Sequence, residues 1–444
     1  MSYAVYKFQP EIGEFAVCCD APPYKFDPDT FKLLGPDYFE KFPVLIDRKI
    51  ALYNNIRHSD CVQCWKKEDM GIRSMRQIFG PRYSELHNNR TLLTTKAYVS
   101  RVELWMNSTC NLGCFMCDLG NSNTLRKIWN DKPDLYGNDK SGYDIWINTN
   151  NYQTEYRAQF TKYMIDFTVE TLRSASYGMN IAYLGGEPTL HDEMYDHADI
   201  FIDAAKENVA LGKEFIIEIV TNGTSKPKLN KRFMEMFQKY KNAGWKIAVM
   251  ISQDASDKYV DVRHGADFNA IKSNFSNWIS SDSMIAQIKS HTVVSNLNIP
   301  YMDKMADYIE DVIVNNYSGD REVVINFNTL SNPDWMHLKY LPKKYAEKPL
   351  MYAKEKLSKL KSEYGIDVDT LIFDEILNAL PDKISNDDAI MLFDNYKYIH
   401  NQYKKVYNGW NFFETFDHLK PFAEAVSYTH LRAHETGRNL VCRL

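Results

Sequence analysis

"NSTCNLGCFMCDLGNSN", residues 107–123, carries three of the eight cysteines of this 444-residue chain. Cys110, Cys114 and Cys117 follow the spacing C-x3-C-x2-C. Three thiols so close together are better explained as ligands of one shared metal centre than as buried core residues. A structural zinc site is closed by four ligands, but no further Cys or His follows before His191. Three thiolates instead suit three irons of a 4Fe–4S cube, so that the fourth iron stays open for another ligand.

The composition is typical of a soluble globular protein, with 44% hydrophobic and 25% charged residues. The net charge of −5 argues against a general nucleic-acid binder, which usually carries a basic excess. No apolar run is long enough to span a membrane, and residues 1–15 do not resemble a signal peptide. We therefore expect a cytoplasmic protein, in which clustered cysteines are more often metal ligands than disulfides.

From residue 101 onward, short β-rich runs alternate with segments of helical period. The apolar residues of 194–205 and of 302–313 recur with the spacing of one helix face. This alternation predicts an α/β protein with a parallel sheet, and six such units suit a partial (β/α)6 barrel. The strands are expected at 101–107, 180–185, 215–221, 246–252, 289–295 and 322–328.

Short polar or glycine-containing segments end these strands, where parallel α/β sheets place their sites. The second strand ends in GGEP (185–188), the third in TNGT (221–224), the fourth in SQD (252–254) and the fifth in TVVSN (292–296). Arg263, a little after the fourth strand, suits a charge-assisted contact with a carboxylate. The order of these segments predicts one site at the carboxyl edge of the sheet.

The three-cysteine loop and the segments that follow it resemble the radical S-adenosylmethionine (SAM) enzymes over residues 100–330. The resemblance implies a 4Fe–4S cluster on Cys110, Cys114 and Cys117, with SAM held by its open iron. It also implies that one electron cleaves SAM, and that the 5′-deoxyadenosyl radical then abstracts hydrogen from a substrate. The family often has an aromatic residue before the third cysteine, where this chain has Met116. The SAM-binding residues that the resemblance implies are Gly185, Gly186, Glu187, Pro188, Asn222, Ser252, Asp254, Arg263, Ser295 and Met116.

Four further thiols lie near the amino terminus, at Cys18, Cys19, Cys61 and Cys64. Four thiolates suit an auxiliary 4Fe–4S cluster or an all-cysteine zinc site. Neighbours in an extended segment point to opposite sides, so one of Cys18 and Cys19 can miss the metal. With the later pattern CxxCW-x-x-E…G-x-x-S-x-R, the segment resembles the SPASM/twitch domains of radical SAM proteins, closest to a phage and metagenome type in which this domain precedes the core. The resemblance favours a second iron–sulfur cluster, with zinc or no metal as alternatives.

The sequence divides into four expected parts. Residues 1–95 form a Cys-rich SPASM/twitch-like domain, 96–335 the radical SAM core and 336–425 a helical extension with a solvated charged face. Residues 426–444 resemble translated adapter sequence and are expected to be a non-native tail. Within the core, 118–150 is a long polar excursion, which is either a lid or an ordinary surface insertion.

These features predict a radical SAM enzyme that takes electrons from an external donor. Auxiliary clusters commonly accompany peptide or protein modification in this family, so the resemblance implies a peptide or protein substrate. A small-molecule or nucleotide substrate is the alternative within the same enzyme class. A non-enzymatic zinc-binding module is the alternative from another class, but it leaves the strand-end segments without a role.

Overall fold

The structure is a computed structural model in which part of the chain is described. Cys19, most of the 118–150 excursion and the whole of 426–444 lie outside the described residues, so the predictions for them stay predictions. The described residues are 5–11, 13–18, 21–27, 29–30, 38–41, 43–54, 56–74, 76–77, 99–117, 119–129, 154–280, 284–330, 333–406 and 410–419.

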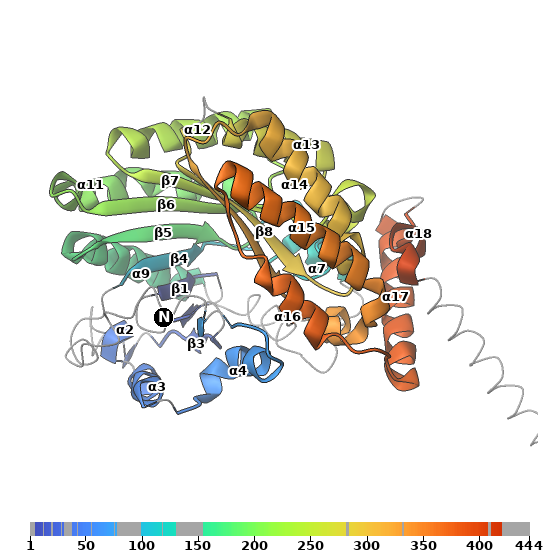
Figure 1. The fold of residues 1–444 in the computed structure, drawn as a ribbon. Coiled ribbons are helices and arrows are strands. Elements are labelled where there is room, and N and C mark those ends of the chain that lie inside the picture. The colour runs from blue at the N-terminus through green and yellow to red at the C-terminus, as the bar shows by residue number, and fades with distance from the viewer. Residues whose placement is uncertain are drawn as a thin grey trace, which may run out of the picture.

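One mainly parallel sheet runs through the molecule, in the order β10-β9-β8-β7-β6-β5-β4-β1-β2-β3 (Figure 1). The strands from β4 to β9 are parallel neighbours in chain order, β1 joins β4 in parallel and β10 joins β9 in parallel. β2 and β3 are antiparallel to their neighbours. The strands are β1 (Val5–Gln9), β2 (Glu14–Ala16), β3 (Tyr24–Lys25), β4 (Arg101–Trp105), β5 (Gly178–Leu184), β6 (Glu214–Thr221), β7 (Lys246–Ser252), β8 (Gln287–Val294), β9 (Glu322–Thr329) and β10 (Asp367–Val368).

The six strands predicted from the alternating pattern are confirmed as β4 to β9. Helices follow most of these strands and connect them, as a parallel sheet requires. The helices are α2 (Tyr38–Lys41), α3 (Pro43–Tyr53), α4 (Val62–Asp69), α7 (Asn123–Trp129), α9 (Thr154–Ser174), α10 (Asp192–Asp196), α11 (Ala198–Ala210), α12 (Pro227–Asn242), α13 (Phe268–Ile279), α14 (Met302–Asn316), α15 (Glu347–Tyr364), α16 (Leu371–Ala379), α17 (Asn386–Val406) and α18 (Phe412–Thr415). The α/β class is therefore established, whereas closure into a partial barrel stays a prediction.

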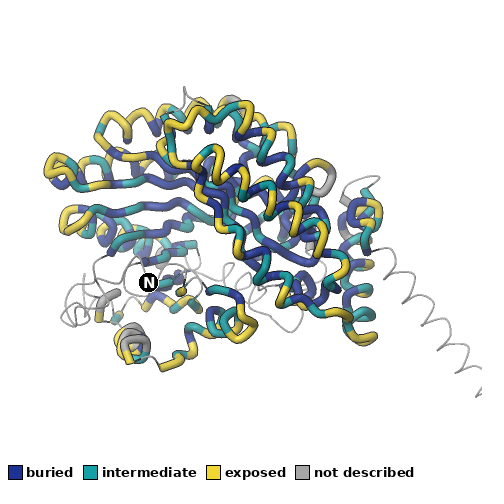
Figure 2. Tube along the Cα trace, in the orientation of Figure 1, coloured by how far each residue is buried: buried dark blue, intermediate teal, exposed yellow. Residues whose placement is uncertain are grey.

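The two faces of the sheet differ in character. Side chains of one face, such as Ile181, Ile217 and Val249, are fully buried in the main hydrophobic core, which is dark blue along the strands in Figure 2. The other face carries charge: the buried Glu218 carboxylate accepts from Asn180 at 2.7 Å and pairs with Arg101 and with Lys289, the latter at 3.1 Å. Burial alone would raise the pKa of Glu218, but the two cations hold it well below its usual range.

The amino-terminal segment is continuous with this sheet. Lys7 on β1 lies opposite Glu103 on β4, so the described strands before residue 95 extend the sheet of the expected core. Further along, Arg73 binds Glu375 on α16, with Nε 2.5 Å from the carboxylate, and also pairs with Asp369. The segment therefore contacts the sheet at β4 and reaches an element that follows β10 (Figure 1). None of the described helices is both long and apolar enough to cross a bilayer.

His418 links the carboxyl-terminal extension to the loop that follows β8. Its Nδ1 lies 2.9 Å from the Tyr301 hydroxyl and its Nε2 lies 3.2 Å from the carbonyl oxygen of Asn296. Burial lowers the pKa of His418 to about 4, below the value near 6.5 of an exposed histidine in the unfolded chain. A group with a lowered folded pKa stabilises the fold above the unfolded pKa, and this stability is lost as the pH falls from about 6.5 to about 4.

We therefore expect the free energy of unfolding, measured in urea, to fall over that pH range by up to roughly 3 kcal/mol through this histidine. His418→Gln keeps a polar side chain without the titration and should reduce the slope. His400→Gln, at a half-buried position on α17, is the matched control and should keep most of it. An unchanged slope in His418→Gln would contradict the assignment.

Candidate functional site

The predicted site residues gather at one edge of the sheet. The three-cysteine loop follows β4, Gly185–Pro188 follows β5 and Asn222 follows β6. Ser252 is the last residue of β7, Asp254 comes two positions later, and Ser295 follows β8. Because these strands are parallel and adjacent, their carboxyl ends meet at the same edge. The structure thus brings together the residues that the sequence placed at successive strand ends.

The Gly185–Pro188 turn packs directly against the start of the cysteine loop. The Glu187 amide donates to the carbonyl oxygen of Thr109 at 2.8 Å, and His191 Nε2 lies 3.0 Å from the same oxygen. Gly186 has a φ of +55°, and a Cβ there would lie 2.4 Å from Thr109 O. Only glycine permits this approach. The turn and Cys110, the next residue after Thr109, are therefore fixed next to each other.

The Glu187 side chain ties the turn after β5 to the end of β6. It is 2% exposed, and its carboxylate accepts from Thr221 Oγ1, from the Asn222 amide and from Thr189 Oγ1, each at 2.8 Å. These donors occupy both carboxylate oxygens. The Glu187 carboxylate therefore holds two strand ends together, and the SAM contact that the resemblance implied for Glu187 stays a prediction.

Asn222 connects the end of β6 to the cysteine loop. Its Nδ2 donates to Asn111 Oδ1 at 2.8 Å, and Asn111 Nδ2 donates to Thr224 Oγ1, also at 2.8 Å. The sequence analysis did not single out Asn111, which lies between two of the cysteines. Its only signal was its position inside the C-x3-C-x2-C loop.

Two backbone hydrogen bonds hold the cysteine loop against the segment that ends η7 (Asp257–Arg263). The amide of Gly113 donates to His264 O, and the amide of Phe115 donates to Val262 O, both at 3.0 Å. The residues between these pairs, Cys114 and Arg263, are therefore neighbours, and Arg263 Nη1 lies 3.9 Å from Cys114 Sγ.

Arg263 is anchored from behind by Asp254. The Arg263 Nε lies 2.6 Å from Asp254 Oδ2, and the other carboxylate oxygen accepts from the Val293 amide at 2.7 Å. Both side chains are largely shielded from solvent, at 12% and 0% exposed. Asp254 thus holds the Nε side of Arg263, and the predicted contact of Arg263 with the carboxylate of SAM stays a prediction.

The charge of Arg263 acts on all three thiols of the loop. Burial raises the pKa of Cys110 to about 12 and raises that of Cys114, while Arg263 opposes the shift in both. Burial alone would lower the pKa of Arg263, but Asp254 and the thiols of Cys114 and Cys117 raise it above its usual range. The three thiols therefore share one cationic neighbour, which favours their thiolate forms.

Soft thiolate donors with a fixed cation beside them fit an iron–sulfur cluster in donor type and in charge. Among the described side chains, no three of the types His, Cys, Asp and Glu are already arranged as ligands of a metal ion. The fit of Cys110, Cys114 and Cys117 is thus one of chemistry and shared surroundings, and their role as ligands stays a prediction.

An aromatic cluster from the carboxyl-terminal extension covers the outer side of the cysteine loop. The Tyr403 hydroxyl on α17 donates to Gly113 O at 2.9 Å. The rings of Tyr403 and Phe115 meet edge to face, with centroids 4.9 Å apart. The cluster consists of Phe115, Tyr403, Trp410, Phe412 and Phe416.

Three further predicted residues lie around this edge. Met116 is half-buried and packs against the same hydrophobic region as the aromatic cluster. Ser295 is fully buried, and its amide donates to Asn298 Oδ1 at 2.8 Å. Ser252 is half-buried at the end of β7 and lies opposite His291 of β8. The contacts of these residues with SAM stay predictions.

The amino-terminal cysteines also lie near one another. Cys18 comes two residues after β2, Cys61 ends η2 (Ser59–Cys61) and Cys64 lies on α4. Burial raises the pKa of Cys61 to about 11, and the thiols of Cys18 and Cys64 are close enough to raise it further. Cys18 and Cys64 are therefore within electrostatic range of Cys61, but among the described residues these thiols are not arranged as ligands of a metal ion, and Cys19 lies outside those residues.

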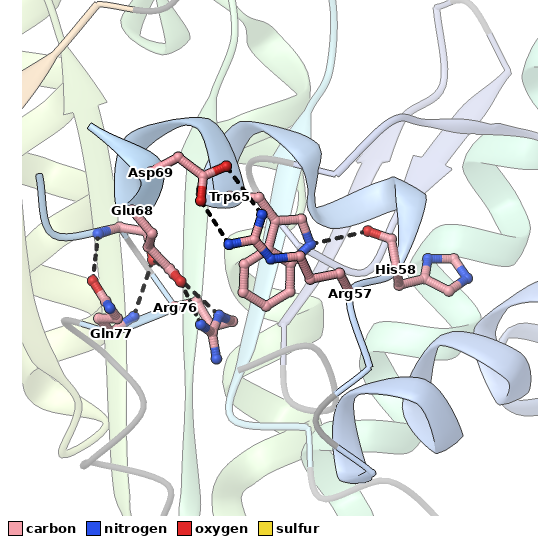
Figure 3. A network of polar contacts seen from close by, with 8 residues as sticks. Arg57, His58, Trp65, Glu68, Asp69, Arg76 and Gln77 are labelled. Carbon is pink, nitrogen blue, oxygen red and sulfur yellow. Dashed lines mark hydrogen bonds and ion pairs between the residues drawn. The ribbon is translucent and has the colours of Figure 1, made fainter. Parts of the chain in front are cut away.

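The helix that carries Cys64 is braced on its exposed side (Figure 3). The Trp65 ring lies between two cations, with Arg76 Cζ 4.2 Å and Arg57 Cζ 5.1 Å from the ring centroid. Arg57 forms a double hydrogen bond with Asp69, at 2.6 and 3.0 Å, and Arg76 pairs with Glu68 at 2.6 Å. Trp65 therefore packs between charged side chains that fix α4.

No family model and no curated protein matches this chain. Among solved structures, hexahistidine-tagged anSMEcpe with bound AdoMet is similar at 14% identity and a TM-score of 0.36, covering 61% of this chain and 63% of that chain. Native anSMEcpe with bound AdoMet is similar at 14% identity and a TM-score of 0.37, covering 61% of this chain and 64% of that chain. This chain thus spans less than two-thirds of either structure, and the site itself is the stronger basis for a function.

The Glu187 network gives a direct test of how the site is held. Glu187→Gln places an amide N–H₂ against at least one donor, so we expect it to lower the free energy of unfolding by about 1–3 kcal/mol. Urea unfolding monitored by fluorescence measures the difference. Glu207→Gln, at an exposed position on α11, is the matched control and should change stability by less than about 0.5 kcal/mol. Equal stability of the two variants would contradict this role.

Proposed function

We propose that the chain is a radical SAM enzyme whose core 4Fe–4S cluster is held by Cys110, Cys114 and Cys117. The observation that carries the proposal is the position of Cys114, which two backbone hydrogen bonds place beside the buried cation Arg263. A loop with three thiols supplies fewer ligands than a closed site needs, which suits a cluster with one open iron. The hydrogen-abstracting chemistry of such a site comes from the cluster and SAM when both are bound.

The residues of the chain have separate roles in this proposal. Asp254 orients Arg263, whose charge balances the thiolates. Gly185 and Gly186 form a turn without side chains next to the start of the cysteine loop, and backbone carbonyl groups of this turn would accept from the ammonium group of SAM. The aromatic cluster with Tyr403 keeps water from the outer side of the loop. Ser252, Ser295 and Met116 are further candidates for contacts with SAM.

We propose a peptide or protein as the substrate and an external protein as the electron donor. The support is the second group of thiols, because an auxiliary cluster in addition to the core cluster suits this class of reaction. Cys18, Cys61 and Cys64 would hold that cluster, with Cys19 as a further candidate ligand. The partial (β/α)6 barrel and a cytoplasmic location belong to the same proposal.

Anaerobic reconstitution with iron and sulfide tests the proposal directly. We expect a brown protein with about four irons in the core site and release of 5′-deoxyadenosine from SAM after addition of a strong reductant. Mass spectrometry of candidate peptides after turnover then identifies the substrate class. A colourless protein that takes up only zinc would instead support the metal-binding module.

A single cysteine variant distinguishes the loss of a core ligand from the loss of any other cysteine. Cys114→Ala removes one of three ligands, so we expect loss of core iron and at least a hundredfold drop in 5′-deoxyadenosine formation. Cys442→Ala is the matched control, because this cysteine lies in the segment 426–444 that we expect to be non-native. Wild-type release of 5′-deoxyadenosine by Cys114→Ala would refute the assignment.

A further inference from the structure

A buried arginine lies beside the amino-terminal thiols. Arg48, on α3, has a side chain that is only 1% exposed. Its Nε and both terminal nitrogens have no hydrogen-bond partner among the described residues. Arginine is rarely buried without partners, because its charge and its five N–H donors lose their hydration. An unmatched cation of this kind is a reason to look for an anion that belongs next to it.

The neighbours of Arg48 identify the place of that anion. The Arg48 Nη1 lies 3.8 Å from Asp60 Oδ2, which is too far for a hydrogen bond. Asp60 is already engaged, since it accepts a hydrogen bond from the Tyr24 hydroxyl. The charge of Arg48 also acts on the Cys61 thiol, which is the residue next to Asp60. The donors of Arg48 are therefore unused in a buried position next to the segment that carries Asp60 and Cys61.

The core site shows the same combination in a completed form. Arg263 forms a close ion pair with Asp254, its Nε 2.6 Å from the carboxylate, and its Nη1 donates to Cys114 Sγ at 3.9 Å. Arg48 lies beside Cys61 with an aspartate at 3.8 Å and no matched donor among the described residues. Each group of thiols thus has a buried guanidinium near it, but of the two only Arg263 has a close ion pair with an aspartate and a hydrogen bond to a thiol.

We propose that Arg48 is the built-in counter-charge of the amino-terminal cysteine site, and that this site holds a redox-active iron–sulfur cluster whose reduced form Arg48 stabilises. The proposal rests on the auxiliary cluster of the proposed function. An oxidised cluster with three thiolate ligands carries one net negative charge, and its reduction by one electron adds a second negative charge. A cation held within the protein interacts more strongly with the reduced form and raises the reduction potential. Arg48 is a positioning and tuning residue, and it is not a ligand.

The reduction potential tests this role without reference to activity. In full-length protein carrying Cys110→Ala, Cys114→Ala and Cys117→Ala, all reconstituted iron belongs to the amino-terminal site. We expect Arg48→Gln to shift the oxidised-to-reduced equilibrium at least tenfold towards the oxidised form, which is about 59 mV for one electron. Arg48→Lys keeps the charge and should retain most of the potential. Arg173→Gln, at an exposed position on α9, should leave the potential unchanged.

Stability with and without the cluster provides a second test. In the metal-free full-length protein, Arg48→Met removes a buried charge without partners and should leave the thermal midpoint equal or higher. After reconstitution the same variant should unfold at a lower temperature than the parent and lose iron faster to a chelator. The sign of the change therefore reverses on loading, which a merely structural arginine would not produce.

Three outcomes overturn the inference. These are an unchanged potential in Arg48→Gln with full iron content, equal destabilisation of the metal-free and loaded proteins by Arg48→Met, and a site that takes up only zinc. None of them depends on the core cysteines, so the inference can fail while SAM cleavage is intact. Conversely, if the core site binds no iron, the proposed function is overturned, but the reduction potential and stability of the amino-terminal site can still be measured.

Discussion

The candidate site depends on a two-bond backbone ladder between the cysteine loop and the segment after β7. The bonds from Gly113 to His264 and from Phe115 to Val262 fix the register of two loops that lie far apart in the sequence. Register decides which side chains face each other, so it places a thiol and a guanidinium in contact. Without it, Arg263 would still be held by Asp254 but would have no fixed relation to the loop.

The surroundings of the ladder are built to keep that register. Tyr403 binds the carbonyl oxygen of Gly113, the same residue whose amide begins the ladder. On the opposite side, Asn111 is tied to the end of β6 through Asn222. Both contacts are made to the short stretch between Cys110 and Cys114, the first to its backbone and the second to the Asn111 side chain. A loop that would otherwise sample many conformations is thereby held by three different strand ends and one helix of the extension.

Local patterns predicted much of the fold but less of the site. The alternation of strand and helix patterns predicted β4 to β9, because strands that are buried on both faces appear in the sequence as short apolar runs. The roles of Glu187 and Asn111 depend on which loops meet, and a motif does not contain that information. The extension was expected to present a solvated charged face, yet it buries Tyr403 and Phe412 against the site. A helix with one polar face can bury its apolar face, and only the tertiary structure shows what that apolar face packs against.

The contact between Arg73 and Glu375 has a consequence for how the protein is made. The two residues lie 302 positions apart, so at roughly 5–20 residues per second the ribosome delivers the second on the order of 15–60 s after the first. β1 is also synthesised before β4, its parallel neighbour in the sheet. Until β4 is available, the edge of β1 is unpaired and can pair with other nascent chains. The yield of soluble protein should therefore depend on how well chaperones shield the first segment during translation.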